Sequence, residues 1–109
     1  MYVIGKNDYD FIEITDQPLM TDGEKYWNPI LGLEYETPLN RATIIVDYEG
    51  AKEILKEIQN NAENIEFTNS SIIGQILDKE HSFDKIGYSK ELKIYKLTPV
   101  VVNKYNDDF

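Results

Sequence analysis

The clearest pattern along the chain lies between residues 41 and 62, where an apolar run is followed at once by an amphipathic period. The β-branched run at 42–46 predicts a strand that is buried on both faces. Asp47 follows it and suits a helix N-cap, because its carboxylate can accept a hydrogen bond from a free amide of the first turn. The helical spacing then predicts an amphipathic helix that ends near Asn60 and Asn61. Its apolar stripe consists of Ala51, Ile54, Leu55, Ile58 and Ala62.

Shorter apolar runs predict the other elements. The first two strands form a hairpin around the turn signal at 5–8. A second helix is predicted over 70–79, capped by Thr68 or Asn69, and Gly74 weakens it by roughly 1 kcal/mol. The polar stretch at 81–89 predicts a loop. The predicted strands are 2–4, 9–15, 33–36, 65–67 and 91–97, and the second helix carries a stripe of Ile72, Ile73, Ile76 and Leu77.

This order of elements predicts an α+β fold, a small and mostly antiparallel sheet with two helices on one face. The chain of 109 residues is expected to form one domain over 1–109. Pro99 makes residues 100–102 either an edge continuation of the preceding strand or a separate short strand. Residues 103–109 are expected to be a flexible acidic tail.

Residues 16–32 are the least regular part of the predicted fold. Proline and glycine interrupt the segment repeatedly, yet it contains Tyr26, Trp27 and several aliphatic residues. A long loop with this composition either packs on the sheet or presents a binding surface.

The composition limits the class of protein. The hydrophobic fraction is 41%, and the chain contains no cysteine, which excludes disulfides and thiolate metal sites. No apolar run approaches the roughly 18 residues that span a membrane, and no signal peptide opens the chain. We therefore expect a soluble, cytoplasmic protein.

The net charge of −9 is concentrated in the first third of the chain. Residues 1–40 contain eight acidic and two basic residues, for a net −6, and residues 41–109 contain twelve acidic and nine basic residues, for a net −3. So acidic a protein is not expected to bind nucleic acid through phosphates or to approach anionic membranes.

Recognisable catalytic and metal motifs are missing from the sequence. His81 is the single histidine, and no serine or cysteine nucleophile is positioned near it by a known motif. Asp8 and Asp10 form a D-x-D pair, but the further ligands of a calcium loop are missing. We expect no enzyme activity, no cofactor and no metal.

The acidic residues suggest a binding surface instead. Asp8 and Asp10, and likewise Glu34 and Glu36, are two apart on predicted strands, so each pair lies about 6.6 Å apart on one face. Such a face could imitate a nucleic-acid backbone and bind a basic groove, although an ordinary solubilising surface has the same appearance. The interleaved aromatic residues favour binding. The candidate partner-binding residues are Asp8, Asp10, Glu13, Asp22, Glu24, Tyr26, Trp27, Glu34, Tyr35 and Glu36.

The segments YVIG, ATIIVDYEGAKEIL and LKIYKLTPVVV carry a structural resemblance. In their order and type, the chain resembles small accessory proteins of phages and mobile elements of low-GC Gram-positive bacteria. Anti-CRISPR proteins and other inhibitors of host defence occur among these proteins. The resemblance implies an anti-defence inhibitor and identifies no functional residue.

The sequence suggests three possible functions. The first is a non-enzymatic inhibitor of a host defence or nucleic-acid-acting protein with a basic surface, as a monomer or a homodimer. The second is an immunity protein that neutralises a toxin. The third is an oligomeric binder that sequesters a small nucleotide signal, for which only Arg41 and scattered lysines offer positive charge.

Overall fold

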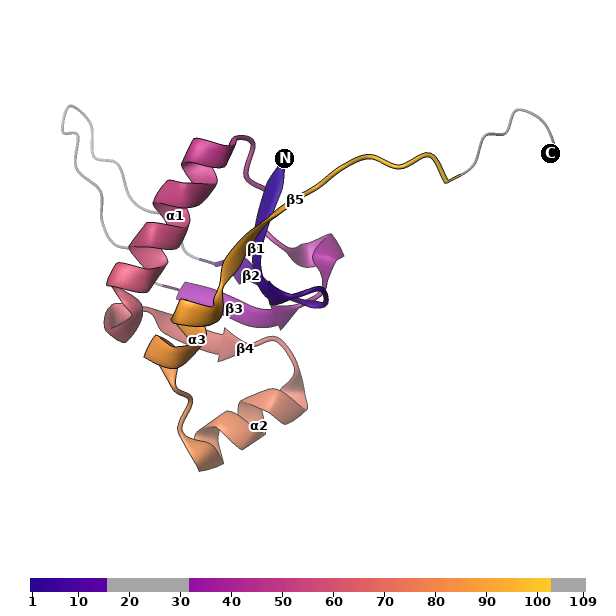
Figure 1. The fold of residues 1–109 in the computed structure, drawn as a ribbon. Helices are drawn as coiled ribbons and strands as arrows, with labels where there is room; N and C mark the ends of the chain where they lie inside the picture. Colours follow the sequence, from indigo (N-terminus) through magenta and orange to yellow (C-terminus); the bar gives the residue numbers. More distant parts are fainter. Residues whose placement is uncertain (16–31, 103–109) are drawn as a thin grey trace.

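The computed structural model describes residues 1–15 and 32–102, which form one five-stranded sheet with helices beside it (Figure 1). The strand order across the sheet is β4-β3-β2-β1-β5. The strands are β1 (Tyr2–Asn7), β2 (Asp10–Ile14), β3 (Gly32–Thr37), β4 (Glu66–Asn69) and β5 (Lys93–Lys96). The helices are α1 (Tyr48–Asn60), α2 (Ile72–His81) and α3 (Lys85–Glu91), with 3-10 turns at Leu39–Arg41 and Ala62–Asn64.

The sheet is mostly antiparallel. β1 pairs antiparallel with both β2 and β5, and β2 pairs antiparallel with β3. β3 and β4 run parallel, and the chain crosses between them through α1, as parallel neighbours require. The predicted α+β class with a mostly antiparallel sheet is confirmed.

The two helices that cover one face of the sheet are α1 and α3, whereas α2 lies beyond the edge strand β4 (Figure 1). Ala51 and Ile58 of α1 are fully buried against Ile4, and Tyr88 of α3 joins the same core. A smaller cluster around Val3, Phe11 and Ala42 fills the opposite face.

Helix α1 forms as the sequence predicts. The Asp47 carboxylate accepts a hydrogen bond of 2.6 Å from the backbone N–H of Gly50, so it caps the first turn. At the other end the N–H of Asn61 donates to the carbonyl of Glu57, and the helix stops there. The local sequence therefore sets both ends of this helix.

The strand predicted at 42–46 is wrong. Only Ile45 pairs with β1, through two backbone hydrogen bonds of 2.8 Å to Tyr2, while Ile44 and Val46 are 55% and 75% exposed. β1 already has β2 and β5 as neighbours. β2 pairs with β1 only at Gly5 and Asn7, so Ile45 pairs with β1 at Tyr2, where β2 does not.

The loop predicted at 81–89 is also wrong over its second half, which is the helix α3. Asp84 caps this helix by accepting a 3.0 Å hydrogen bond from the N–H of Gly87. Two of its residues, Tyr88 and Ser89, are buried. In a helix this short, one buried turn outweighs the polar composition on which the loop prediction rested.

Smaller corrections concern the strand ends. The turn of the first hairpin lies at Asp8 and Tyr9 rather than at 5–8, because β1 continues to Asn7. The last strand is limited to Lys93–Lys96, and residues 100–102 are in no strand.

A buried carboxylate joins the sheet to α3. Asp10 is only 8% exposed, and its Oδ1 accepts hydrogen bonds from the N–H of Glu36, at 2.8 Å, and from the hydroxyl of Tyr88, at 3.0 Å. Desolvation raises the pKa of Asp10 above its ordinary value, against the opposing effect of these two hydrogen bonds. Desolvation likewise raises the pKa of the Tyr88 hydroxyl, and the adjacent Asp10 carboxylate adds to the shift.

An aromatic cluster lies beside this carboxylate. The rings of Tyr35 and Phe83 are stacked with centroids 4.4 Å apart, and Tyr88 contacts both of them at tilted angles. Phe67 contacts Phe83 at a tilted angle and Tyr88 edge-on. Tyr35 is 3% exposed. The cluster therefore connects β3, β4 and α3 through one set of rings.

Candidate protein-binding face

Helix α2 is attached to the sheet through polar groups. Ser71 caps the helix by accepting a 2.9 Å hydrogen bond from the N–H of Gly74. The buried side chain of Asn69 accepts hydrogen bonds of 2.8 Å from both the N–H and the hydroxyl of Ser71. The side chain of Gln75 donates to the carbonyl of Asn69 at 2.7 Å. The side of α2 that faces the sheet is therefore its polar side.

As a result, the apolar stripe of α2 points into solvent. Its four aliphatic residues are 48–76% exposed, and the buried cores contain no residue of α2. A surface helix normally buries such a stripe. We call this surface the α2 face, and it consists of Ile72, Ile73, Ile76 and Leu77.

Gly74 allows α2 to approach β4 closely. A Cβ atom at this position would overlap the Asn69 side chain, which is itself buried and held by Ser71. Replacing Gly74 with Ala is therefore expected to lower the free energy of unfolding by about 1 kcal/mol, because steric overlap costs more than the gain in helix propensity.

Urea unfolding of the Gly74→Ala variant measures this effect. Gly50→Ala is the matched control, since a Cβ there lies 3.0 Å from the Asp47 carboxylate at an exposed helix start. A Gly74→Ala variant that is more stable than the wild type would show that propensity alone governs this helix.

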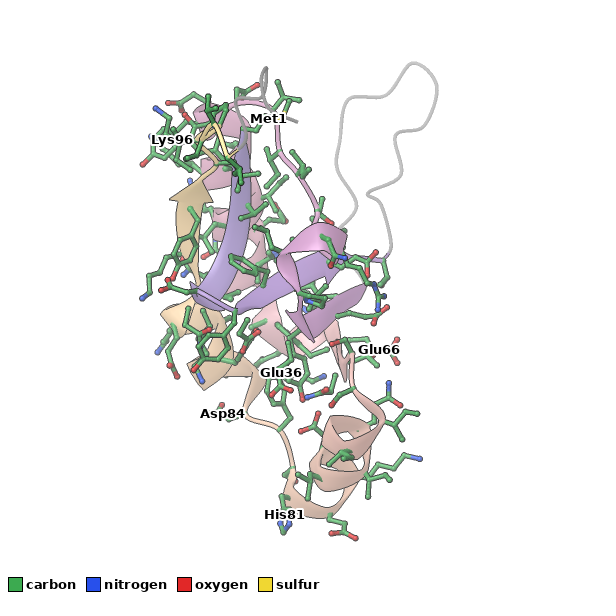
Figure 2. The ribbon with its side chains drawn as sticks, turned by 90° about the vertical axis from the view of Figure 1, so that its right-hand side faces the viewer. Met1, Glu36, Glu66, His81, Asp84 and Lys96 are labelled. Carbon is green, nitrogen blue, oxygen red and sulfur yellow. The ribbon has the colours of Figure 1, made fainter. Side chains whose placement is uncertain are left out.

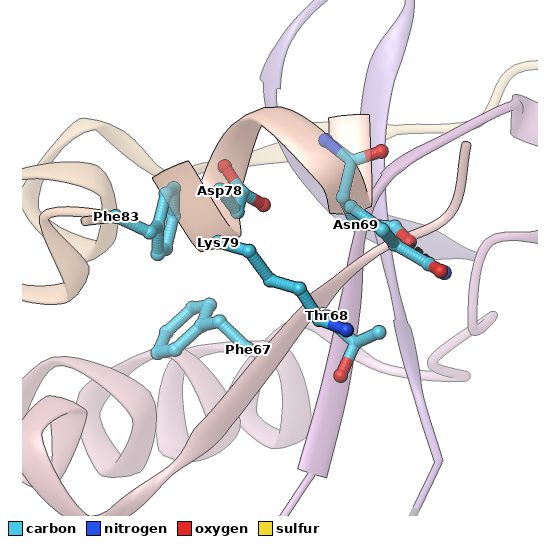
Figure 3. Close-up of a pocket in the computed structure, with 7 residues that line it drawn as sticks. Phe67, Thr68, Asn69, Asp78, Lys79 and Phe83 are labelled. Carbon is cyan, nitrogen blue, oxygen red and sulfur yellow. Dashed lines mark hydrogen bonds between the residues drawn. The ribbon is translucent and has the colours of Figure 1, made fainter. Parts of the chain in front are cut away.

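A shallow groove of about 320 Å³ separates α2 from β4 (Figure 3). The rings of Phe67 and Phe83 form one end of it, and Lys79 extends from α2 toward Thr68. Desolvation raises the pKa of Asp78, which lines the groove next to Lys79. The lining residues are Phe67, Thr68, Asn69, Gln75, Asp78, Lys79 and Phe83.

The acidic face predicted from the sequence is only partly present on the surface. Asp10 and Tyr35 are buried, so they are not available to a partner, and this part of the prediction is wrong. Strand alternation suggested that Asp10 shares an exposed face with Asp8. The Asp10 side chain instead points to α3, where its carboxylate accepts a hydrogen bond from the Tyr88 hydroxyl.

The remaining predicted residues are more exposed. Nη2 of Arg41 lies 2.9 Å from Oε1 of Glu13 and 3.6 Å from Oε1 of Glu34, so the guanidinium partly neutralises both carboxylates. Asp8 and Glu36 are exposed, and Glu36 and Glu66 are visible on the same side of the molecule in Figure 2. Four further candidates lie outside the described residues: Asp22, Glu24, Tyr26 and Trp27.

The single histidine is 72% exposed at its side chain, with Nε2 3.9 Å from the carboxylate of Glu80. Within residues 1–15 and 32–102, no group of three or more His, Cys, Asp or Glu side chains is placed to hold a metal ion. No helix in this part of the chain is long and apolar enough to cross a membrane.

Comparisons with protein-family models, with curated proteins and with solved structures found no match for this chain. The function is therefore inferred from the geometry of the chain itself. The sequence does contain the α2 stripe, but only the position of Asn69 shows which way the stripe points.

Proposed function

We propose that this chain is a non-enzymatic binding protein that presents the α2 face to a protein partner. The supporting observation is the outward direction of four large aliphatic side chains on one helix, held in place by polar contacts on its other side. Isolated exposed apolar residues are ordinary, whereas a contiguous apolar patch on a monomer typically marks an interaction site. The spacing of these residues suits insertion of the helix into an apolar groove.

The chemistry of the partner follows from charge. The chain has a net charge of −9, and Glu80 lies at the C-terminal end of the α2 face on the same helix. A partner groove with an apolar floor and basic borders complements both features. Together with the resemblance to phage accessory proteins, this favours an inhibitor of a host defence or nucleic-acid-acting protein in a bacterial cytoplasm.

Ile76→Glu tests this proposal, with Ile86→Glu as the matched control. Both residues are isoleucines on helices and are similarly exposed, at 54% and 42%, but Ile86 lies on α3. Immobilised wild-type protein is used to capture partners from a Gram-positive lysate at low and high salt, and mass spectrometry identifies them. Binding of the same partner to Ile76→Glu is expected to fall by at least about tenfold, since burying one such side chain contributes about 1.5–3 kcal/mol.

The control variant should bind like the wild type. High salt should weaken wild-type binding, because screening reduces attraction between an acidic chain and a basic partner. Equal binding of the two variants would contradict a role for the α2 face.

The groove beside α2 supports a second candidate function, the binding of a small nucleotide. Two phenyl rings provide a stacking surface, and Lys79 provides one positive charge at its edge. A thermal-shift series with nucleotides, using wild type and Lys79→Ala, tests this candidate. A shift that Lys79→Ala abolishes would support it, and the absence of any shift in the wild type would exclude the nucleotides tested.

A further inference from the structure

The end of the described chain leaves the fold as an apolar arm. After β5, residues 97–102 extend away from the sheet in Figure 1. Leu97 is anchored, since its N–H donates to the carbonyl of Met1 at 2.8 Å and its side chain packs on the smaller core cluster. The three following valines, Val100, Val101 and Val102, are 75–93% exposed. The arm carries no charged residue.

A second exposed apolar patch lies where the arm begins. It is formed by Met1, Ile44 and Val46, all more than half exposed. Ile45 pairs with Tyr2 on one side of β1, and Leu97 bonds to Met1 on the other side. The two segments are therefore about two strand spacings apart, or roughly 10 Å.

The arm is not directed toward the patch of its own chain. Pro99 has a fixed φ and no N–H to donate, and it also biases Thr98 toward an extended conformation. The chain therefore continues outward after Leu97 instead of reversing. Residues 98–102 reach about 17 Å at the usual rise of an extended chain, which is enough to cross to a neighbouring molecule.

We propose that the occupant of this patch is the arm of a second copy, so that the chain forms a two-fold dimer by exchanging arms. The patch and the root of the arm lie at the same end of the molecule, and a two-fold axis beside them lets each arm cover the patch of the other copy. Valine-rich extended segments favour pairing on a half-buried surface. Each contact occurs twice, which doubles the apolar area covered.

The electrostatics of this dimer differ from those of the proposed partner complex. Two copies of a chain with net charge −9 repel each other, while the arm and the patch themselves contribute no acidic residue. Salt screens the repulsion, so the dimer should become tighter as salt increases. Binding to a basic partner through the acidic surface should become weaker. The two proposals can therefore fail independently.

Sedimentation velocity of the full chain over a concentration series tests the dimer. Wild-type protein is expected to shift from monomer to dimer as concentration rises. Val101→Asp in the arm and Val46→Lys in the patch are each expected to sediment as monomers, whereas Ile86→Asp on α3 should behave like the wild type. Circular dichroism confirms that the variants are folded, which is expected because all three residues are exposed.

Mixing the two variants gives the decisive result. In a mixed dimer, Val46→Lys supplies an intact arm to the intact patch of Val101→Asp, and the two altered sites bring opposite charges together. The mixture is therefore expected to form a dimer although each variant alone does not. A wild-type chain that stays monomeric at every concentration and salt, or a dimer that survives either single substitution, would overturn the proposal.

Discussion

Replacing Asp10 with Ala is expected to lower the free energy of unfolding by about 2–4 kcal/mol, since it leaves two buried or partly buried donors unpaired. These donors are the Tyr88 hydroxyl and the N–H of Glu36, which both donate to Oδ1 of Asp10. Tyr88 is only 6% exposed, so water has little access to its hydroxyl. Urea unfolding followed by circular dichroism measures the change as a lower midpoint at a similar slope.

Asp10→Asn is the matched control, because its Oδ1 can still accept both hydrogen bonds. Burial raises the pKa of Asp10 in the folded protein above the ordinary value of 3.8. Above the folded pKa, the charge is present in both states and weakens the fold. As pH falls through the folded pKa toward 3.8, the folded state takes up the proton first and this penalty disappears.

Asp10→Asn carries no such penalty. Its free energy of unfolding should therefore be close to, or above, that of the wild type at pH 7, and the difference should shrink as pH falls toward 4. A difference that instead grows on acidification would mean that the pKa of Asp10 is lowered in the fold.

The case of Asp10 shows why the sequence could not give the acidic surface correctly. Alternation along a strand places residues on one of two faces, but it does not say which face is covered. The tyrosine that donates a hydrogen bond to Asp10 is 78 positions away along the chain. It lies in a helix, whereas the polar composition of that segment predicted a loop. Burial of a carboxylate depends on such a distant partner, so a local pattern cannot reveal it.

Prediction succeeded where the deciding contacts are local. The start of α1 depends on Asp47 and the amide of Gly50 three positions later, and both could be read directly. The fold class followed from the order of elements. The strand predicted at 42–46 is wrong although its β-branched residues suit a strand, because only Ile45 finds a pairing partner, at Tyr2 of β1.

For the candidate site, the sequence predicts the apolar stripe of α2 but not the direction in which the stripe points. The stripe on α2 is evident from spacing alone, and the helix was placed nearly correctly. Its outward direction depends on Asn69 and Gln75, which attach the polar side to β4. The run Asn69-Ser70-Ser71 before the stripe, with Gly74 one turn into the helix, is the signal that could have indicated this attachment.

Replacing Tyr35 with Ala is expected to have the largest effect, a loss of about 3–5 kcal/mol of unfolding free energy, as for other large aromatic truncations in a core. The sequence favoured Tyr35 as a partner-binding residue, yet its ring stacks on Phe83 and contacts Tyr88 inside the protein. Thermal and urea unfolding measure the loss directly. If the variant unfolds like the wild type and loses only partner binding, Tyr35 belongs to an interface after all.

Tyr35→Phe separates the ring from the hydroxyl. The Tyr35 hydroxyl oxygen is buried and accepts or donates no hydrogen bond among the residues that the structure describes. Removing it keeps the stacked ring while relieving an uncompensated desolvation of roughly 1–3 kcal/mol, so this variant should be at least as stable as the wild type. A loss of unfolding free energy for Ala and no loss for Phe would separate the contribution of ring packing from that of the hydroxyl. This result would also show that a residue of the predicted acidic and aromatic surface acts in the core, where it holds β3 against α3.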